Sequence, residues 1–182
     1  GYRVSWCVGH LIQMANPDSY DEKYAKWNME DLPIIPSEYK YEVSKSTKKQ
    51  FSFLKKLLND KEVENVINAC DAGREGESIF RLVYNQANCK KKMKRLWISS
   101  MTDEAIKQGF ASLKDQQQYE PLYLAGLSRA IGDWLLGMNA TRLYTLKYGQ
   151  NRQVLSIGRV QTPTLALIVN RQKEIDNFKP EP

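Results

Sequence analysis

Short runs of β-forming residues recur through the first half of the chain. Residues 3–8 (RVSWCV) are rich in such residues and end at Gly9, so they predict a strand that leads into a loop. Apolar runs at residues 63–70 and 94–99 predict two further short strands.

Stretches with helical spacing lie between these runs. Hydrophobic residues at helical intervals predict helices over residues 46–59 and 75–86, and Thr102 is a typical N-cap for a third helix. Strands that alternate with helices indicate parallel βα units. We therefore expect an α/β fold in this part of the chain.

The pattern changes at about residue 116. Helical spacing runs from Pro121 to Tyr148 and again over residues 160–178, with no strand signal of comparable strength. We therefore expect an α/β domain over residues 1–115 and an α-helical region over residues 116–182. The proline- and aromatic-rich segment 16–36 is expected to be an ordered excursion, because its aromatic side chains need a surface to pack on.

Composition narrows the class of protein. With 182 residues, 42% hydrophobic and 26% charged, the chain has the size of one compact domain or two small ones. No apolar run approaches the roughly 20 residues that span a bilayer, so a membrane protein is not expected. The first residues read as the middle of a strand and do not include an initiator Met, so we expect an excised piece without a secretory signal.

Cysteines and charge add two weaker indications. Three cysteines without a CxxC pair indicate neither a disulfide framework nor a zinc site, and a reducing compartment is the simple interpretation. A net charge of +6 favours a polyanionic partner. Its lysine-rich blocks, at residues 45–49 and 90–95, are more typical of a solvated surface.

The densest chemical signal is the segment 71–77 (DAGREGE), here called the acidic turn, which falls between a predicted strand and a predicted helix. Carboxyl ends of strands are where active groups gather in α/β sheets, and the Asp71 and Glu75 carboxylates are ligands of the kind that Mg²⁺ prefers. An equally good interpretation is that Glu75 and Glu77 stabilise a helix N-terminus, by about 0.3–1 kcal/mol each. A nucleotide-binding loop is weakly supported, because no GxxxxGK[ST] or GxGxxG pattern occurs.

Several blocks together resemble one family. The chain is similar to bacterial DNA topoisomerase III, of the type IA topoisomerase family, and the acidic turn resembles the Toprim motif of that family. The matching blocks occur in one order over nearly the whole chain: WCVGHL (6–11), YAKWNM (24–29), DLPIIP (31–36), the acidic turn, RAIGDWLLGMNATR (129–142) and LSIGRVQTPTL (155–165).

The resemblance implies a fold and an activity. It implies a Toprim-like parallel sheet flanked by helices over residues 1–115, lacking its first strand, and the helical part of a DNA-binding groove over residues 116–182. The implied activity is the cutting of one DNA strand by a tyrosine that becomes joined to the 5′-phosphate, passage of a second strand, and resealing, with Mg²⁺ and without ATP. The family's first acidic residue and its nucleophilic tyrosine lie outside this chain, so the fragment alone is expected to bind DNA without cutting it.

The resemblance also assigns residues. Asp71 is the expected metal ligand, and Glu75 the expected catalytic acid and second ligand. The usual pattern is Asp-x-Asp-x-Glu, and Gly73 stands where the second aspartate is expected, so Glu77 is considered as a substitute ligand. Residues expected to bind single-stranded DNA, through cations and stacking aromatics, are Trp27, Arg129, Trp134, Arg142, Ser156, Ile157, Gly158, Arg159, Val160 and Gln161.

Simpler interpretations of these residues stay open. Trp134 is of a size that is usually buried in a core, and Arg129 and Asp133, four apart, are placed to pair on a helix. His10, the single histidine, has no assigned role.

Two alternative functions follow from the same signals. The first is another Toprim enzyme, a primase or an OLD-type nuclease, which is expected to lack the RVQTP block found here at residues 159–163. The second is a non-catalytic DNA-binding module. The leading hypothesis places the protein in the bacterial cytoplasm, associated with the nucleoid, with single-stranded DNA as its partner and neither a membrane nor a nucleotide cofactor.

Overall fold

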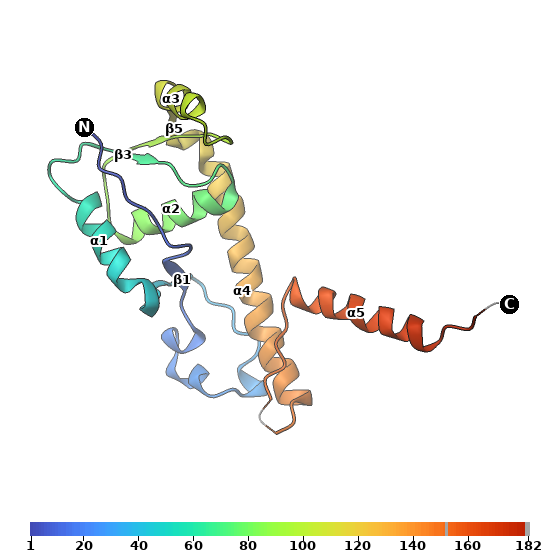
Figure 1. Cartoon of the computed structure of the whole chain (residues 1–182). Helices are drawn as coiled ribbons and strands as arrows, with labels where there is room; N and C mark the ends of the chain where they lie inside the picture. The colour runs from blue at the N-terminus through green and yellow to red at the C-terminus, as the bar shows by residue number, and fades with distance from the viewer. Residues whose placement is uncertain (152, 181–182) are drawn as a thin grey trace. The chain divides into compact units, whose positions relative to one another are not determined.

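The structure is a computed structural model and describes residues 1–151 and 153–180 (Figure 1). The chain forms two compact units, which are described separately below. The first comprises residues 1–15 and 39–130, and the second comprises residues 16–38 and the chain from residue 131 onward. The long helix α4 (Glu120–Tyr148) contributes residues to both units.

The first unit contains a three-stranded sheet. Its order is β3-β4-β5, with β3 parallel to β4 and β4 antiparallel to β5. Helix α2 connects the parallel pair, so the expected βα unit is confirmed, and α3 connects β4 to β5. The bounds are β3 (Asn65–Asn68), α2 (Arg74–Gln86), β4 (Lys92–Arg95), α3 (Asp103–Ala111) and β5 (Lys114–Asp115).

Strand β4 begins and ends earlier than the apolar run at residues 94–99 predicts. Its register pairs Asn65 with Lys92 and Asn68 with Arg95, so β4 is confined to the residues that pair with β3. The predicted cap of α3 is confirmed, since the Thr102 Oγ1 accepts a hydrogen bond from the Ala105 amide at 3.3 Å.

The prediction of a strand over residues 3–8 is wrong. These residues have no regular secondary structure, and the first strand, β1 (Ile12–Met14), follows them and pairs antiparallel with β2 (Tyr41–Val43). Among the described residues, no backbone hydrogen bond joins residues 3–8 to a neighbouring strand. Propensity for β structure is realised only where a partner strand satisfies the backbone groups, and this segment has none here.

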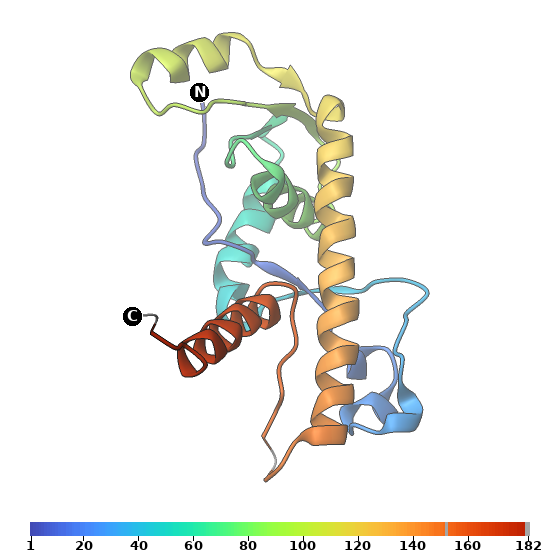
Figure 2. The same cartoon turned by 90° about the vertical axis from the view of Figure 1, so that its right-hand side faces the viewer.

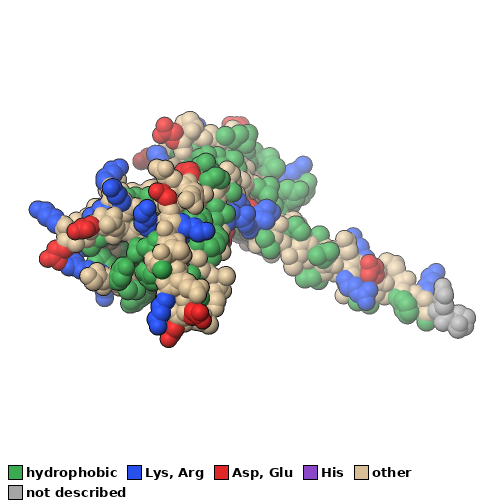
Figure 3. Space-filling view, turned by 90° about the horizontal axis from the view of Figure 1, so that it is seen from above, with side chains coloured by type: hydrophobic (Ala, Val, Ile, Leu, Met, Phe, Trp, Pro, Cys, Tyr) green, Lys and Arg blue, Asp and Glu red, His purple; other side chains and the backbone are tan. Residues whose placement is uncertain are grey.

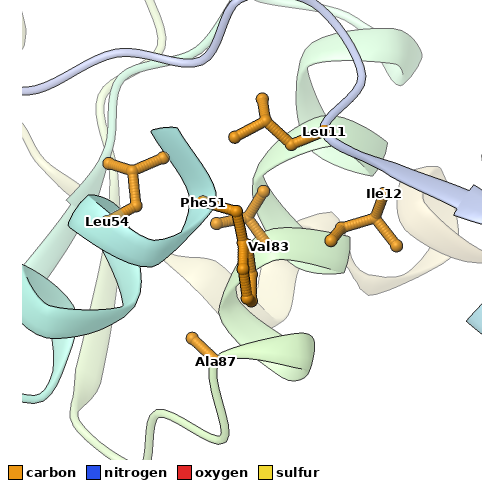
Figure 4. Close-up of a cluster of buried hydrophobic side chains, with 6 residues drawn as sticks. All are labelled: Leu11, Ile12, Phe51, Leu54, Val83 and Ala87. Carbon is orange, nitrogen blue, oxygen red and sulfur yellow. The ribbon is translucent and has the colours of Figure 1, made fainter. Parts of the chain in front are cut away.

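The core of the first unit joins β1, α1 (Lys48–Leu58) and α2 (Figure 4). The helical spacing predicted over residues 46–59 is confirmed, because α1 buries Phe51 and Leu54 and half-buries Leu57 and Leu58 on the same face. The chain enters α1 through the 3-10 turn η4 (Lys45–Thr47), and a second turn, η5 (Gln116–Tyr119), precedes α4. The buried cluster consists of Leu11, Ile12, Phe51, Leu54, Val83 and Ala87.

In the second unit, three short 3-10 turns lie beside the later part of α4, as Figures 1 and 2 both show. Asn139 of α4 holds both backbone groups of the buried Ile34: its Oδ1 accepts from the Ile34 amide at 2.6 Å, and its Nδ2 donates to the Ile34 carbonyl at 3.0 Å. The expectation that this excursion is ordered is therefore confirmed. The turns are η1 (Pro17–Ser19), η2 (Glu22–Ala25) and η3 (Met29–Asp31).

The second unit ends with α5 (Gln161–Asp176), which exposes many hydrophobic side chains, including Leu165, Leu167 and Ile168 (Figure 3). Within the described part of the chain, no helix combines the length and the apolar character needed to cross a membrane.

Candidate metal and nucleic-acid sites

The acidic turn lies where β3 ends and α2 begins. The Gly73 amide donates to the Asp71 carbonyl at 2.8 Å, which closes a tight turn, and the Glu77 amide donates to the Gly73 carbonyl at 3.1 Å as the helix starts. The first turn of α2 packs directly on the Asp71 backbone. A Cβ added at Gly76 would lie 2.7 Å from the Asp71 nitrogen and 2.9 Å from its carbonyl carbon, so this close approach requires glycine.

Both carboxylates that the sequence assigns to metal binding are exposed on this turn. Asp71 and Glu75 both have exposed side chains, and the Glu75 Oε2 lies 3.3 Å from the His10 Nε2. Sequence reasoning assigned no role to His10, and the structure places it against Glu75. His10 follows Gly9, which has a φ of +69° and so adopts a conformation that favours glycine.

The chemistry of these two carboxylates suits a hard divalent cation. Mg²⁺ typically takes one or two protein carboxylates and keeps several waters, and Asp71 and Glu75 supply two carboxylates. Over the described residues, no cluster of three or more His, Cys, Asp or Glu side chains is arranged to hold a metal. These residues therefore suit a partly hydrated ion and do not form an all-protein cage.

Glu77 is unavailable as a substitute ligand, which corrects the expectation that it compensates for Gly73. Its side chain is fully buried, its Oε2 accepts from the Asn68 Nδ2 at 3.0 Å, and its Oε1 accepts from Gln116. The Arg95 Nε lies 3.3 Å from the same carboxylate. Burial raises the pKa of Glu77 although the Arg95 charge opposes the shift.

Gly73 itself is not required by the backbone. Its φ of 179° is extended, and a Cβ added there would meet nothing within 4 Å. The turn thus carries two carboxylates at the positions where the family pattern has three, although a third has room.

Two cysteines lie next to the turn. The Cys7 thiol hydrogen-bonds the Cys70 sulfur, and this bond lowers the pKa of Cys70 and raises that of Cys7. Desolvation opposes the shift at Cys70, and the nearby Arg95 charge supports it. These directions make Cys70 the thiol of the pair that ionises first.

In the second unit, hydroxyl groups of α4 fix the segment that precedes α5. The Thr141 Oγ1 accepts from the Ile157 amide at 2.9 Å, and the Thr145 Oγ1 accepts from the Leu155 amide at 2.9 Å. Sequence reasoning missed both threonines. Their spacing of four residues, which puts them on one face of a helix, was the available signal.

The residues predicted to bind DNA around Arg159 lie together. The Arg159 Nε and Nη2 donate to the two carboxylate oxygens of Asp133 at 2.7 and 3.3 Å, and both side chains are nearly half exposed. The Gln161 Nε2 donates to the Ser156 Oγ at 2.9 Å. A shallow hollow at the start of α5 is lined by Gly158, Val160, Gln161, Thr164, Leu165 and Ile168.

Arg142 and Trp27 contact each other. The Arg142 guanidinium lies 5.1 Å from the centre of the Trp27 ring, and it donates to the Tyr24 carbonyl at 2.9 Å. Arg142 is only 5% exposed, and burial lowers its pKa. This contact fastens the 16–38 excursion to α4, and a role for either side chain on DNA stays a prediction.

The two remaining predicted DNA contacts differ in environment. Trp134 is half-buried and meets Tyr20 edge-on, with ring centres 5.9 Å apart. Arg129 is exposed on the part of α4 that belongs to the first unit.

Comparison with known proteins covers almost the whole chain. The Toprim domain family matches residues 1–101, and a family described as DNA topoisomerase matches residues 117–182. DNA topoisomerase 3 of Staphylococcus saprophyticus is 49% identical over 180 residues, which are 99% of this chain and 25% of that protein. DNA topoisomerase 3 of Bacillus thuringiensis is 51% identical over 178 residues, 98% of this chain and 24% of that protein.

A solved structure agrees with these matches. Full-length topoisomerase I from Thermotoga maritima superposes with a TM-score of 0.64 and 25% sequence identity, over 96% of this chain and 27% of that one. The chain spans about a quarter of the length of the curated relatives that it matches. It carries a Toprim domain followed by a DNA topoisomerase region, and it belongs to the Toprim-containing DNA topoisomerase family.

Proposed function

We propose that the protein carrying this chain is a type IA DNA topoisomerase of the topoisomerase III kind. It cuts one DNA strand, passes another through the break and reseals it, with Mg²⁺ and without ATP. The ordered match of two topoisomerase regions over residues 1–101 and 117–182 supports this proposal, as do relatives named DNA topoisomerase 3. The observation that carries it is the exposed Asp71–Glu75 pair on a turn held by the contact between Gly76 and the Asp71 backbone.

In this proposal the acidic turn holds the metal. Asp71 and Glu75 bind Mg²⁺, which when bound supplies positive charge next to a DNA phosphate. His10 orients the Glu75 carboxylate through their 3.3 Å contact. Glu75 is also the proposed acid that exchanges a proton with the DNA, and its exposed side chain supports this role.

The second unit supplies contacts for single-stranded DNA in this proposal. Asp133 orients the exposed Arg159 guanidinium, which is suited to bidentate contact with a phosphate. The exposed side chains of Ser156 and Gln161 add hydrogen-bonding groups beside it. Trp27, Arg129, Trp134, Arg142, Ile157, Gly158 and Val160 complete the proposed set.

Independence from nucleotides and location in the cell are parts of the same proposal. The cleavage joins a tyrosine to DNA and conserves the energy of the phosphodiester bond, so resealing needs no ATP. The sequence carries no Walker-type phosphate loop. Relatives from bacteria support a location in the bacterial cytoplasm, at the nucleoid.

Relaxation of a negatively supercoiled plasmid by the full-length protein tests this function. We expect stepwise relaxation to closed circles with Mg²⁺ and no ATP, no reaction in EDTA, and a large loss of rate in Asp71→Asn. The 182-residue chain alone is expected to bind single-stranded DNA without relaxing the plasmid. Degradation of the plasmid would indicate a nuclease, primer synthesis on a single-stranded template a primase, and DNA binding without any reaction a binding module.

A further inference from the structure

One buried side chain holds the backbone where β3 passes into the acidic turn. Arg95 is fully buried at the end of β4. Its Nη1 lies within hydrogen-bonding distance of the carbonyls of Asn68 at 3.0 Å, Cys70 at 2.6 Å and Leu96 at 3.1 Å, and its Nη2 donates to the Asp71 carbonyl at 2.6 Å. A single guanidinium therefore fixes the path of the chain immediately before the carboxylates.

The guanidinium is itself fixed on its other sides. The Glu77 Oε2 lies 3.3 Å from the Arg95 Nε, and both side chains are fully buried. The Arg95 Cζ lies 5.0 Å from the centre of the Trp97 ring and 5.8 Å from that of Tyr119, and these two rings stack at 4.9 Å. A planar, multiply bonded guanidinium in this setting has little freedom to move, and its donors keep a fixed geometry.

The buried Arg95–Glu77 pair is an unfavourable way to fill the interior of the protein. Taking a guanidinium and a carboxylate out of water carries a penalty that well-packed hydrophobic side chains avoid, so a buried ion pair is weak evidence for a stabilising role. Hydrophobic side chains at these positions would provide no hydrogen-bond donors for the Asn68, Cys70 and Asp71 carbonyls.

We propose that Arg95, held by Glu77, is a positioning residue that sets the geometry of the acidic turn and thereby the affinity of Asp71 and Glu75 for a divalent cation. This proposal rests on the proposed function, because the proposed function is what places the cation at this turn. Groups that orient metal ligands from outside the coordination sphere typically change affinity by about 10- to 100-fold when they are removed.

Arg81 offers a matched control on α2. Its Nη2 pairs with the Glu120 Oε2 at 2.5 Å, its Cζ lies 4.6 Å from the centre of the Tyr123 ring, and its side chain is 12% exposed. It thus resembles Arg95 in being a largely buried arginine with one carboxylate partner and an aromatic contact. None of its described hydrogen bonds goes to the backbone of the acidic turn.

The test uses Mn²⁺ as the probe and follows free Mn²⁺ by electron paramagnetic resonance while the chain is titrated. We expect Arg95→Met to weaken Mn²⁺ binding about 10- to 100-fold, and Arg95→Lys about 10-fold, because lysine keeps the charge without the planar array of donors. Arg81→Met is expected to lower the melting temperature and leave Mn²⁺ affinity unchanged. If Arg95→Met fails to fold, the folded Arg95→Lys protein decides the matter.

Wild-type Mn²⁺ affinity in folded Arg95→Lys, or an equal loss in Arg81→Met, overturns the proposal. In the full-length protein, Arg95→Lys is expected to raise the half-saturating Mg²⁺ concentration for relaxation about 10-fold, with the maximal rate recovered at high Mg²⁺. A lower maximal rate at unchanged Mg²⁺ dependence would indicate a purely structural role and reject positioning. If the wild-type protein relaxes no DNA while Arg95→Lys still weakens Mn²⁺ binding, the proposed function fails and the positioning role stands.

Discussion

The contact between α2 and the Asp71 backbone makes a sharp prediction for Gly76→Ala. The added methyl carbon would lie 2.7 Å from the Asp71 nitrogen and 2.9 Å from its carbonyl carbon, and closer still to the carbonyl oxygen. Rotation of a side chain cannot relieve this overlap, because all three atoms belong to the backbone. That carbonyl oxygen is also held by the Gly73 amide at 2.8 Å and by the Arg95 Nη2 at 2.6 Å.

The size of the effect follows from two opposing terms. Replacing a helical glycine by alanine ordinarily stabilises a protein by about 0.5–1 kcal/mol. Overpacking of a well-filled site costs about 1–3 kcal/mol, and contact with fixed backbone puts Gly76→Ala at the upper end. Gly132→Ala in α4 is the matched control, because a Cβ there meets nothing within 4 Å and only the favourable term applies. We expect the two variants to differ by about 3 kcal/mol.

Urea denaturation followed by far-ultraviolet circular dichroism measures this difference, and titration with Mn²⁺ measures its consequence at the turn. We expect Gly76→Ala to be less stable than the wild type and to bind Mn²⁺ more weakly, and Gly132→Ala to match or exceed the wild type in stability with unchanged affinity. If Gly76→Ala is as stable as Gly132→Ala and binds Mn²⁺ normally, the described packing of α2 on the turn is refuted.

Three further predictions concern other parts of the chain. The hydrogen bond from Cys7 lowers the pKa of Cys70, so the Cys70 thiolate persists at lower pH than an ordinary thiolate. The alkylation rate of Cys70, measured against pH, should therefore have a lower midpoint than that of an ordinary thiol. Cys7→Ala should move this midpoint to higher pH, and an unmoved midpoint contradicts the contact. Asn139→Ala leaves both backbone groups of Ile34 without their partner, and it should lower the free energy of unfolding, measured by urea denaturation, by about 1–3 kcal/mol. Asn28→Ala, which loses one exposed hydrogen bond to Asp31, should lower it far less. Arg159→Ala should lower the affinity for single-stranded DNA in fluorescence anisotropy and reduce the slope of log affinity against log salt concentration by about 0.7. Asp133→Asn should keep that slope. An unchanged slope in Arg159→Ala would contradict a phosphate contact by Arg159.

Local pattern predicted those features that depend on neighbours in sequence. The spacing of Phe51 and Leu54 predicted the buried face of α1, and Thr102 predicted the start of α3, because each rests on residues within one or two helical turns. The strand expected over residues 3–8 failed because a strand depends on a partner elsewhere in the chain.

The sequence pattern did not predict which side chains are buried beneath the candidate metal site. Arg95 ends a lysine-rich block that is typical of a solvated surface, yet it is fully buried, because its partners lie at the ends of two other elements. Glu75 and Glu77 are chemically alike and two residues apart, and the helix turns one toward solvent and the other into the interior. Sequence alone therefore identified the acidic turn without showing which carboxylates remain available to a metal.

The most direct test of the central claim is the nuclear magnetic resonance spectrum of the isotopically labelled 182-residue chain during a titration with Mn²⁺. Paramagnetic broadening at low Mn²⁺ is expected to begin at the amides of His10 and residues 70–77, and to disappear in Asp71→Asn. Broadening that begins elsewhere, or that persists unchanged in Asp71→Asn, would contradict the assignment of a divalent cation to the acidic turn.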